Sequence, residues 1–272
     1  MFTKASVQSG IIILIGLFAG GMTSRVSAAP AGGESHVGRA VPIGRGTAHV
    51  VVGTDVGVKP QSVSVVLSEG ALKGLPTRLS TKNAEGSWVY AVPMPAGPPR
   101  TGYSEVVIDW NPHGHPPPHI YTVPHFDFHF YMISPEAVEK VHFTGPSDPA
   151  AKVLDAAIVP SDYQVIPETV VDKMGVHAVD TLAPEFHGKP FTATFIYGYY
   201  QNRLVFLEPM VTRAFLLTKP DFRLPVRTPA RYSTGGYYPT SYGVRYDAVR
   251  HNYVIELLDL KQWVRHEAAR KP

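Results

Sequence analysis

The segment from Pro124 to Ile133 reads PHFDFHFYMI and alternates aromatic with ionisable side chains. On a β-strand, successive side chains point to opposite faces of the sheet. The aromatic side chains therefore share one face and the ionisable side chains share the other: Phe126, Phe128 and Phe130, against His125, Asp127 and His129. This pattern predicts an extended strand whose aromatic face lies in a hydrophobic core, so the chain must build a sheet at this place.

The ionisable face of this strand is a candidate metal site. Two imidazoles and a carboxylate suit zinc where thiolates are absent, and iron, manganese and nickel also accept them. Side chains two positions apart on one face are ~7 Å apart and can share an ion, whereas those four apart, at ~13 Å, cannot. A flat strand thus supplies either His125 with Asp127 or Asp127 with His129, and the third side chain orients a ligand or moves a proton, unless a bulge bends the strand. The alternative is a solvent-exposed face whose side chains only hydrogen-bond one another.

Two residues later in the chain extend the candidate ligand set. His177 follows a glycine-containing turn region, and Glu208 follows the apolar run 204–207. A carboxylate in such a run is costly to bury unless it is paired, protonated or bound to a cation. With the strand, these residues predict a mixed nitrogen and oxygen site that leaves one position open. His177 could instead be a hydrogen-bonded core histidine, and Glu208 could pair with Arg203 or Arg213.

Five of the twelve histidines lie between His113 and His129. The first three of them, His113, His115 and His119, belong to a proline-rich loop over 111–119. This loop could form the mouth of the site and bring a histidine to the ion. It could equally be a rigid surface connection with exposed histidines.

The first 29 residues have the three parts of a secretory signal peptide. Lys4 is the basic region, 11–21 is the apolar region, and 26–29 is a small-residue cleavage site. We therefore expect an exported protein, periplasmic or extracellular, with no stable membrane insertion after cleavage. Cleavage would remove Lys4 and Arg25 and no acid, so the 25 basic and 22 acidic residues become 23 and 22. Such a balance does not favour nucleic acid as a partner, and the absence of cysteine excludes disulfides.

Proline and glycine residues are spread along the chain and separate short segments rich in Val, Ile, Phe and Tyr. This pattern predicts a mainly β protein, a single β-sandwich or jelly-roll-like barrel over 47–272 with a few short helices near 135–160. The segment 30–46 has little to bury and is expected to be flexible. The predicted strands are 48–53, 61–68, 88–93, 104–110, 124–133, 191–199, 204–211, 242–247 and 253–260, with hairpin turns at 200–203 and 248–252.

Four segments resemble an exported bacterial family of unknown function whose best-known member is controlled by an extracytoplasmic sigma factor and anti-sigma factor pair. They are PHFDFHFYMIS at 124–134, MGVH at 174–177, FIYGYY at 195–200 and FLEPM at 206–210. The resemblance extends from about Trp110 to Asp247 and implies an exported β-rich protein without naming a reaction. The ligand layout is also similar to that of cupins, but it departs from them because Asp127 stands where a histidine of the cupin pair would be.

Several familiar catalytic signatures are absent from the sequence: the Gly-x-Ser-x-Gly elbow, the phosphate-binding loop, the His-Glu-x-x-His motif and any cysteine nucleophile. Our leading hypothesis is an exported protein that binds a divalent metal, zinc above others, through His125, Asp127, His129, His177 and Glu208. Such a site could catalyse metal-assisted hydrolysis or hydration of a small molecule. The alternative is a non-catalytic envelope-stress or ligand-binding protein, oligomeric, with a structural metal site. The sequence leaves open whether the protein is an enzyme.

Overall fold

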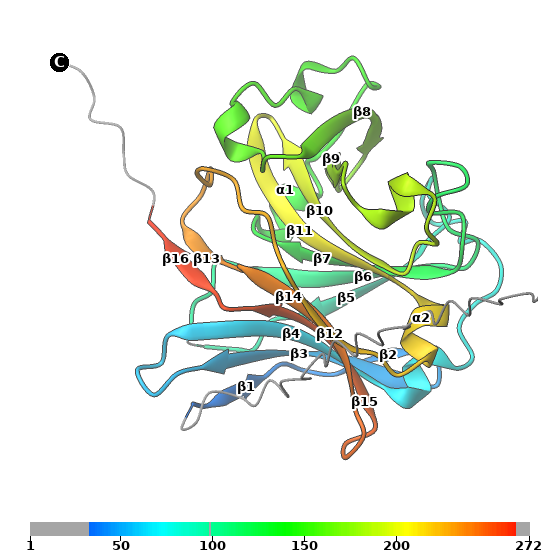
Figure 1. Cartoon of the computed structure of the whole chain (residues 1–272), viewed down its shortest axis with the longest axis vertical. Helices are drawn as coiled ribbons and strands as arrows, with labels where there is room; N and C mark the ends of the chain where they lie inside the picture. Colours follow the sequence, from blue (N-terminus) through cyan, green and yellow to red (C-terminus); the bar gives the residue numbers. More distant parts are fainter. Residues whose placement is uncertain (1–32, 98, 265–272) are drawn as a thin grey trace, which may run out of the picture.

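The computed structural model describes residues 33–97 and 99–264. The signal peptide predicted over 1–29 lies outside these residues. Within them the chain forms two seven-stranded antiparallel sheets and a small two-stranded one, with a few short helices. The predicted mainly β fold is confirmed, and the two large sheets pack face to face as a sandwich (Figure 1).

The first sheet has the strand order β1-β3-β4-β15-β14-β12, with β2 paired to the remaining length of β3. Its strands are β1 (Ser35–Val37), β2 (Val41–Ile43), β3 (Gly46–Thr54), β4 (Pro60–Ser68), β12 (Asp221–Pro225), β14 (Ser241–Asp247) and β15 (Asn252–Leu258). The expectation of a flexible segment over 30–46 does not match the described part of that segment. There β1 and β2 hydrogen-bond to β3, and Ile43 is buried in the core.

The second sheet has the order β5-β6-β7-β11-β10-β9-β8. Its strands are β5 (Trp88–Pro93), β6 (Glu105–Asn111), β7 (His125–Tyr131), β8 (Tyr163–Val171), β9 (Gly175–Asp180), β10 (Ala193–Tyr200) and β11 (Arg203–Thr212). Strands β8 and β9 lie at the end of this sheet that is farther from the first sheet (Figure 1). The third sheet pairs β13 (Gly236–Tyr238) with β16 (Lys261–Trp263).

Both predicted hairpins are confirmed. The turn between β10 and β11 consists of Gln201 and Asn202, which both have positive φ angles, +48° and +60°. Such a two-residue turn matches the right-handed twist of the flanking strands. The second hairpin joins β14 and β15. The turns place β11 beside β10 and β15 beside β14, so that each pair is adjacent in its sheet.

The helices are short and connect strands. They are α1 (Pro135–Val138), α2 (Arg213–Leu217) and the 3-10 turns η1 (Glu69–Leu72), η2 (Pro149–Ala151), η3 (Ala156–Ile158) and η4 (Pro184–His187). The helix α1 begins where proline follows an N-cap, because the Ser134 hydroxyl accepts a hydrogen bond from the amide of Ala137. Among the described residues, no helix combines the length and the apolar composition needed to cross a membrane.

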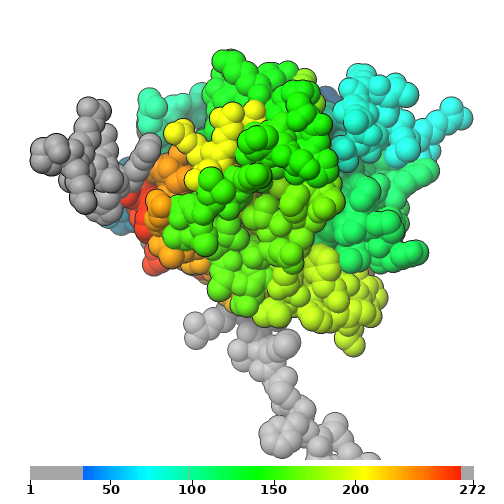
Figure 2. Space-filling view, turned by 90° about the horizontal axis from the view of Figure 1, so that it is seen from above, coloured from blue at the N-terminus to red at the C-terminus, as the bar shows by residue number. Residues whose placement is uncertain are grey.

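The main core fills the space between the two large sheets, with Val50, Val65 and Ile255 from the first sheet and Phe128 and Leu207 from the second. The opposite face of the second sheet is also covered. The green to yellow-green part of the chain, which includes α1, β8 and β9, makes up most of the surface on that side (Figure 2). The second sheet is therefore buried on both faces along its central strands, and β7 has no exposed residue.

Candidate metal centre

The predicted alternation of β7 is confirmed, and both of its faces are buried. Phe126, Phe128 and Phe130 lie in the main core between the sheets. The ionisable side chains point to the other face, and His125, Asp127 and His129 are 0%, 4% and 1% exposed. A solvent-exposed polar face, the alternative raised by the sequence, is therefore excluded. Burial of three ionisable groups needs partners that compensate for the water they lose.

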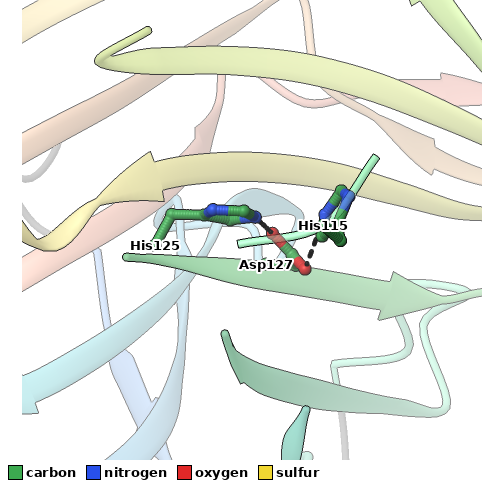
Figure 3. Close-up of side chains that lie close together, drawn as sticks. All are labelled: His115, His125 and Asp127. Carbon is green, nitrogen blue, oxygen red and sulfur yellow. Dashed lines mark ion pairs between the residues drawn. The ribbon is translucent and has the colours of Figure 1, made fainter. Parts of the chain in front are cut away.

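The first of two clusters on this face contains His115, His125 and Asp127 (Figure 3). The Nε2 atom of His125 lies 3.1 Å from Oδ1 of Asp127, and Nε2 of His115 lies 3.5 Å from Oδ2. His125 and Asp127 are two positions apart on β7, which is the pairing that a flat strand allows. His115 comes from the proline-rich loop. That loop closes back on itself at Gly114, where a Cβ would lie 2.0 Å from the carbonyl oxygen of Tyr121 and only glycine fits.

The second cluster contains His129, His177 and Glu208, from β7, β9 and β11. Nε2 of His129 lies 3.5 Å from Oε1 of Glu208, and Nε2 of His177 lies 3.8 Å from Oε2. Two tetrahedral ligands of one zinc ion are ~3.3–3.6 Å apart when each bond is ~2.0–2.2 Å long. The separations in this cluster are close to that geometry. Two histidines and one carboxylate are also a ligand set found in catalytic zinc sites.

Strand pairing places these side chains. The register of β7 and β11 pairs Leu207 with Phe130 and Met210 with Asp127. Glu208 therefore lies opposite His129, on the same face of the sheet. On the other side, the register of β8 and β9 shifts between Ile166 and Val171, which frees the carbonyl group of Thr169.

All four histidines present the same nitrogen to the clusters. Nδ1 lies 2.7 Å from a backbone carbonyl oxygen in three of them, namely His115 with Pro116, His125 with Val123 and His177 with Thr169. In His129, Nδ1 faces Oδ2 of Asp109 at 3.5 Å. A carbonyl oxygen can only accept a hydrogen bond, so Nδ1 carries the proton and Nε2 is left with a lone pair when the imidazole is neutral. Histidines that ligate metals are usually oriented in this way.

The lone pairs of these Nε2 atoms point toward carboxylate oxygens, which are also acceptors. Buried atoms without a hydrogen-bond partner among the described residues include Nε2 of His125 and His129, Oδ1 of Asp127 and Oε2 of Glu208. Facing acceptors repel each other unless a proton or a metal ion lies between them. Each cluster therefore needs a proton or a metal ion between its facing nitrogen and oxygen atoms.

Burial and neighbouring charges give the clusters different electrostatics. In the second cluster, burial lowers the pKa of His129 to about 3 and that of His177 to about 4, and it raises the pKa of Glu208 well above its usual value. In the first cluster, burial opposes charge, but the charges of His125 and His115 hold the pKa of Asp127 well below its usual range. Burial would also lower the pKa of His115, but its contact with Asp127 raises it to about 9. A proton on His115 therefore satisfies the first cluster, whereas the second cluster, with its neutral histidines, can be satisfied by a proton on Glu208 or by a metal ion.

Two further residues of the site were not predicted from the sequence. Asp109 and Asn111 on β6 lie directly opposite Asp127 and His125. The Asn111 amide donates a hydrogen bond of 2.6 Å to Oδ2 of Asp127. Asp109 is 1% exposed and has no hydrogen bond to either carboxylate oxygen within the described structure. Burial and the charge of Asp127 raise its pKa well above the usual value. Asp109 and Asn111 could have been found in the sequence from the alternation Ile108-Asp109-Trp110-Asn111, which parallels that of β7.

The structure brings the five predicted ligands onto one sheet face but divides them between two clusters. The expected single site, with the strand pair joined by His177 and Glu208, does not form, because His125 and Asp127 pair with His115. His129, expected as a partner of Asp127 or as a helper, faces Glu208 instead.

The structure also decides between the alternatives raised for individual residues. Glu208 makes no ion pair with Arg203 or Arg213 within the described residues, and Arg213 donates to the carbonyl oxygen of Leu72. His113 in the proline-rich loop contacts the carbonyl oxygen of Thr77 and belongs to neither cluster. The loop thus contributes one histidine to the site, His115.

A cavity of about 590 Å³ lies beside both clusters. Asp109, Asp127, His129, His177 and Glu208 all line it. Cavities of this size hold small-molecule ligands in other proteins. The open side of each cluster therefore faces a space that a small molecule could occupy.

No protein-family model, no curated protein and no solved structure matches this chain.

Proposed function

We propose that this protein is an exported, divalent-metal-binding protein that holds zinc in the second cluster and uses it for hydrolysis or hydration of a small molecule. The observation that carries the metal site is the shared orientation of the histidines. His129 and His177 both direct Nε2 at Glu208, and Nε2 of His129 and Oε2 of Glu208 are buried without a hydrogen-bond partner among the described residues. Zinc is favoured because histidine dominates the ligand set, with iron and manganese as competitors.

Catalysis is supported by the position of the second cluster. Three protein ligands leave a zinc ion one position for water, and a zinc ion lowers the pKa of bound water to ≈ 7. The residues around the cluster have separate roles. Asp109 lines the cavity, and its Oδ2 faces His129 Nδ1 at 3.5 Å and so helps to orient that ring. Oδ1 of the same carboxyl group has no hydrogen-bond partner among the described residues and can hold or release a proton.

The geometry of the first cluster supports a second candidate function, which is a structural role. Asp127 already accepts a hydrogen bond from Asn111 and contacts His115, which is the one member of the cluster from a loop. An ion or a proton shared by His115 and Asp127 would fasten this loop to β7. A cluster of this kind stabilises the wall of the cavity without taking part in chemistry.

Metal analysis of the mature protein, purified without an affinity tag, tests the proposal. We expect zinc at one equivalent or more per chain. Glu208→Gln should remove the ion of the second cluster, because an amide oxygen is a poor substitute for a carboxylate ligand. His142→Ala is the matched control, since His142 also contacts a carboxylate, that of Asp172 at 2.7 Å, but on the exposed surface.

The outcomes separate the two clusters. Zinc lost in Glu208→Gln and kept in Asp127→Asn assigns the ion to the second cluster. The reverse pattern would move the ion to the first cluster and favour the structural role. Absence of any stoichiometric divalent metal from the wild-type protein, even after equilibration with zinc, would overturn the proposed function.

A further inference from the structure

The cavity has two chemically different walls. One wall consists of ionisable residues of the two clusters, namely His115, Asp127, His129, His177 and Glu208. The other consists of the apolar side chains Ile120, Ile166, Val179, Phe186, Ile196 and Met210, which pack against one another on the outer face of the second sheet and in the segments that cover it. We call this second set the apolar wall. A ligand that fills the cavity must therefore carry an apolar body and a polar head.

The charges around the cavity restrict the head group. The described residues that line it include five carboxylates, Glu85, Asp109, Asp127, Glu168 and Glu208, and no lysine or arginine. Among the described residues that line the cavity, His115 is the cationic side chain, and its charge is already paired with Asp127. A metal ion in the second cluster would therefore be the main attraction for an anionic head, whereas a cationic head could contact the carboxylates directly.

The spacing of the second cluster discriminates between these two heads. Its facing nitrogen and oxygen atoms are 3.5 and 3.8 Å apart. An ammonium nitrogen needs ~2.8 Å to each acceptor, so acceptors placed tetrahedrally around it would be ~4.6 Å apart. The observed atoms are too close together for an ammonium group and fit a metal ion with bonds of ~2.1 Å. The second cluster therefore fits a metal ion, and a metal ion at this place would bind a head group with oxygen donors.

We infer that the cavity binds small monocarboxylates with an apolar body, the carboxylate on the ion of the second cluster and the body along the apolar wall. This inference rests on the proposed metal site and names the class of compound that the site accepts. It requires that binding depends on the metal, because the other cation beside the cavity, His115, is paired with Asp127. It also requires that binding depends on the apolar wall, because a carboxylate alone gains little over water.

Three probes with one body and different heads test the inference: 4-phenylbutyrate, 4-phenylbutan-1-ol and 4-phenylbutylamine. Their affinities are measured by calorimetry on the full mature protein, zinc-loaded and chelator-treated, with the zinc content of each sample determined. We expect 4-phenylbutyrate to bind the zinc-loaded protein at least ~100-fold more tightly than the chelated protein. The alcohol should bind more weakly, and the amine should show no gain from zinc.

Two substitutions test the apolar wall. Ile166→Asn places a polar group in the wall at a half-buried position and should weaken 4-phenylbutyrate by ~10-fold, since a buried aliphatic contact is lost. Ile133→Asn is the matched control, because Ile133 is also a half-buried isoleucine but does not line the cavity. It should leave the affinity unchanged.

Several results would overturn the inference. Zinc-loaded protein that binds none of the probes refutes the ligand class and leaves the metal site standing. Equal binding of all three probes with and without zinc shows an unspecific apolar cavity, and tightest binding of the amine to the chelated protein shows that the carboxylates bind cations directly. Protein without zinc refutes the metal site, and with it the placement of the carboxylate.

Discussion

Gly198 of β10 allows a direct test of how the second cluster is held in place. It pairs with Phe206 on β11 and with His177 on β9. A Cβ atom built on Gly198 would lie 2.1–2.4 Å from three atoms of the Phe206 ring. That ring packs edge-on against His129, with centroids 4.7 Å apart, and lies 5.5 Å from the ring of His177. Gly198→Ala should therefore displace Phe206 and, through it, both histidine rings.

The size of the effect follows from the contact distance. Carbon atoms pack at ≈ 3.5–4.0 Å, so the Phe206 ring must move by about 1.5 Å to admit the new methyl group. Insertion of a methyl group into a packed interior costs about 1–3 kcal/mol of folding free energy. Misdirected histidines should weaken zinc binding by ~10–100-fold, as the loss of an orienting partner does. No metal ligand is altered by the substitution.

The assay combines urea denaturation of the metal-free protein with zinc titration against a competing chelator. Gly243→Ala is the matched control. Its Cβ would also be crowded, 3.0 Å from the carbonyl oxygen of Phe222, but it lies in the first sheet, away from the metal site. It should lower stability without changing zinc affinity.

The double variant Gly198→Ala with Phe206→Ala completes the test. With the ring removed, the added methyl group should cost much less than it does in the wild-type background, which gives a coupling between the two positions. Zinc affinity that is unchanged in Gly198→Ala, despite lower stability, would refute the idea that Phe206 positions the histidines. A loss of stability below about 0.5 kcal/mol would show that the crowding is relieved elsewhere.

Three other predictions concern the core, the titration of the metal-free site and Asp109. Phe128→Ala should cost about 3–5 kcal/mol in urea denaturation, because Phe128 is fully buried between the sheets, and a loss below about 1 kcal/mol would contradict this. The pKa of His177 is lowered by burial from 6.5 to about 4, so the unfolded chain binds more protons between these values and metal-free protein should lose stability as the pH falls from 6.5 toward 4. Relative to His177→Gln, the metal-free wild-type protein should lose about 2–3 kcal/mol of its free energy of unfolding between pH 7 and pH 4.5. A stability difference between the two proteins that does not change with pH would contradict the burial of a neutral imidazole. Asp109→Ala should weaken zinc by ~10–100-fold, whereas Asp109→Asn should keep most of the affinity because its amide oxygen can still face Nδ1 of His129, and equal losses in both would show that Asp109 does not orient this ring.

The sequence predicted those parts of the fold that local pattern determines. The nine predicted strands all correspond to strands of the structure, because their alternation or their β-branched and aromatic content is strong. The short or irregular strands β1, β2, β8, β9, β12, β13 and β16 were not predicted. For example, β8 contains Pro167 and shifts its register, so its pairing depends on β9 rather than on its own residues.

The candidate site was predicted in kind but not in grouping. The residue types along β7 indicated metal ligands, and its alternation placed them on one face. Which ligands share a cluster depends on contacts between residues far apart in the chain. His115 reaches Asp127 through the fold of its loop, and His177 reaches Glu208 across β10. Asp109 was missed because its role comes from the residue opposite it on the neighbouring strand.

Within its seven residues, strand β7 separates the positions that determine packing from those that determine the chemistry of the cavity. Substitutions at its even-numbered positions, such as Phe128, change how the sheets pack, whereas substitutions at odd-numbered positions, such as Asp127, change the chemistry of the cavity. The chemistry can therefore be altered, in evolution or by engineering, while the packing of the sandwich is kept. An insertion or deletion of one residue in β7 would change both packing and chemistry, because it would turn the phenylalanines toward the cavity and the ionisable groups into the core. This strand should tolerate exchange of residues at odd positions and should not tolerate any change in its length.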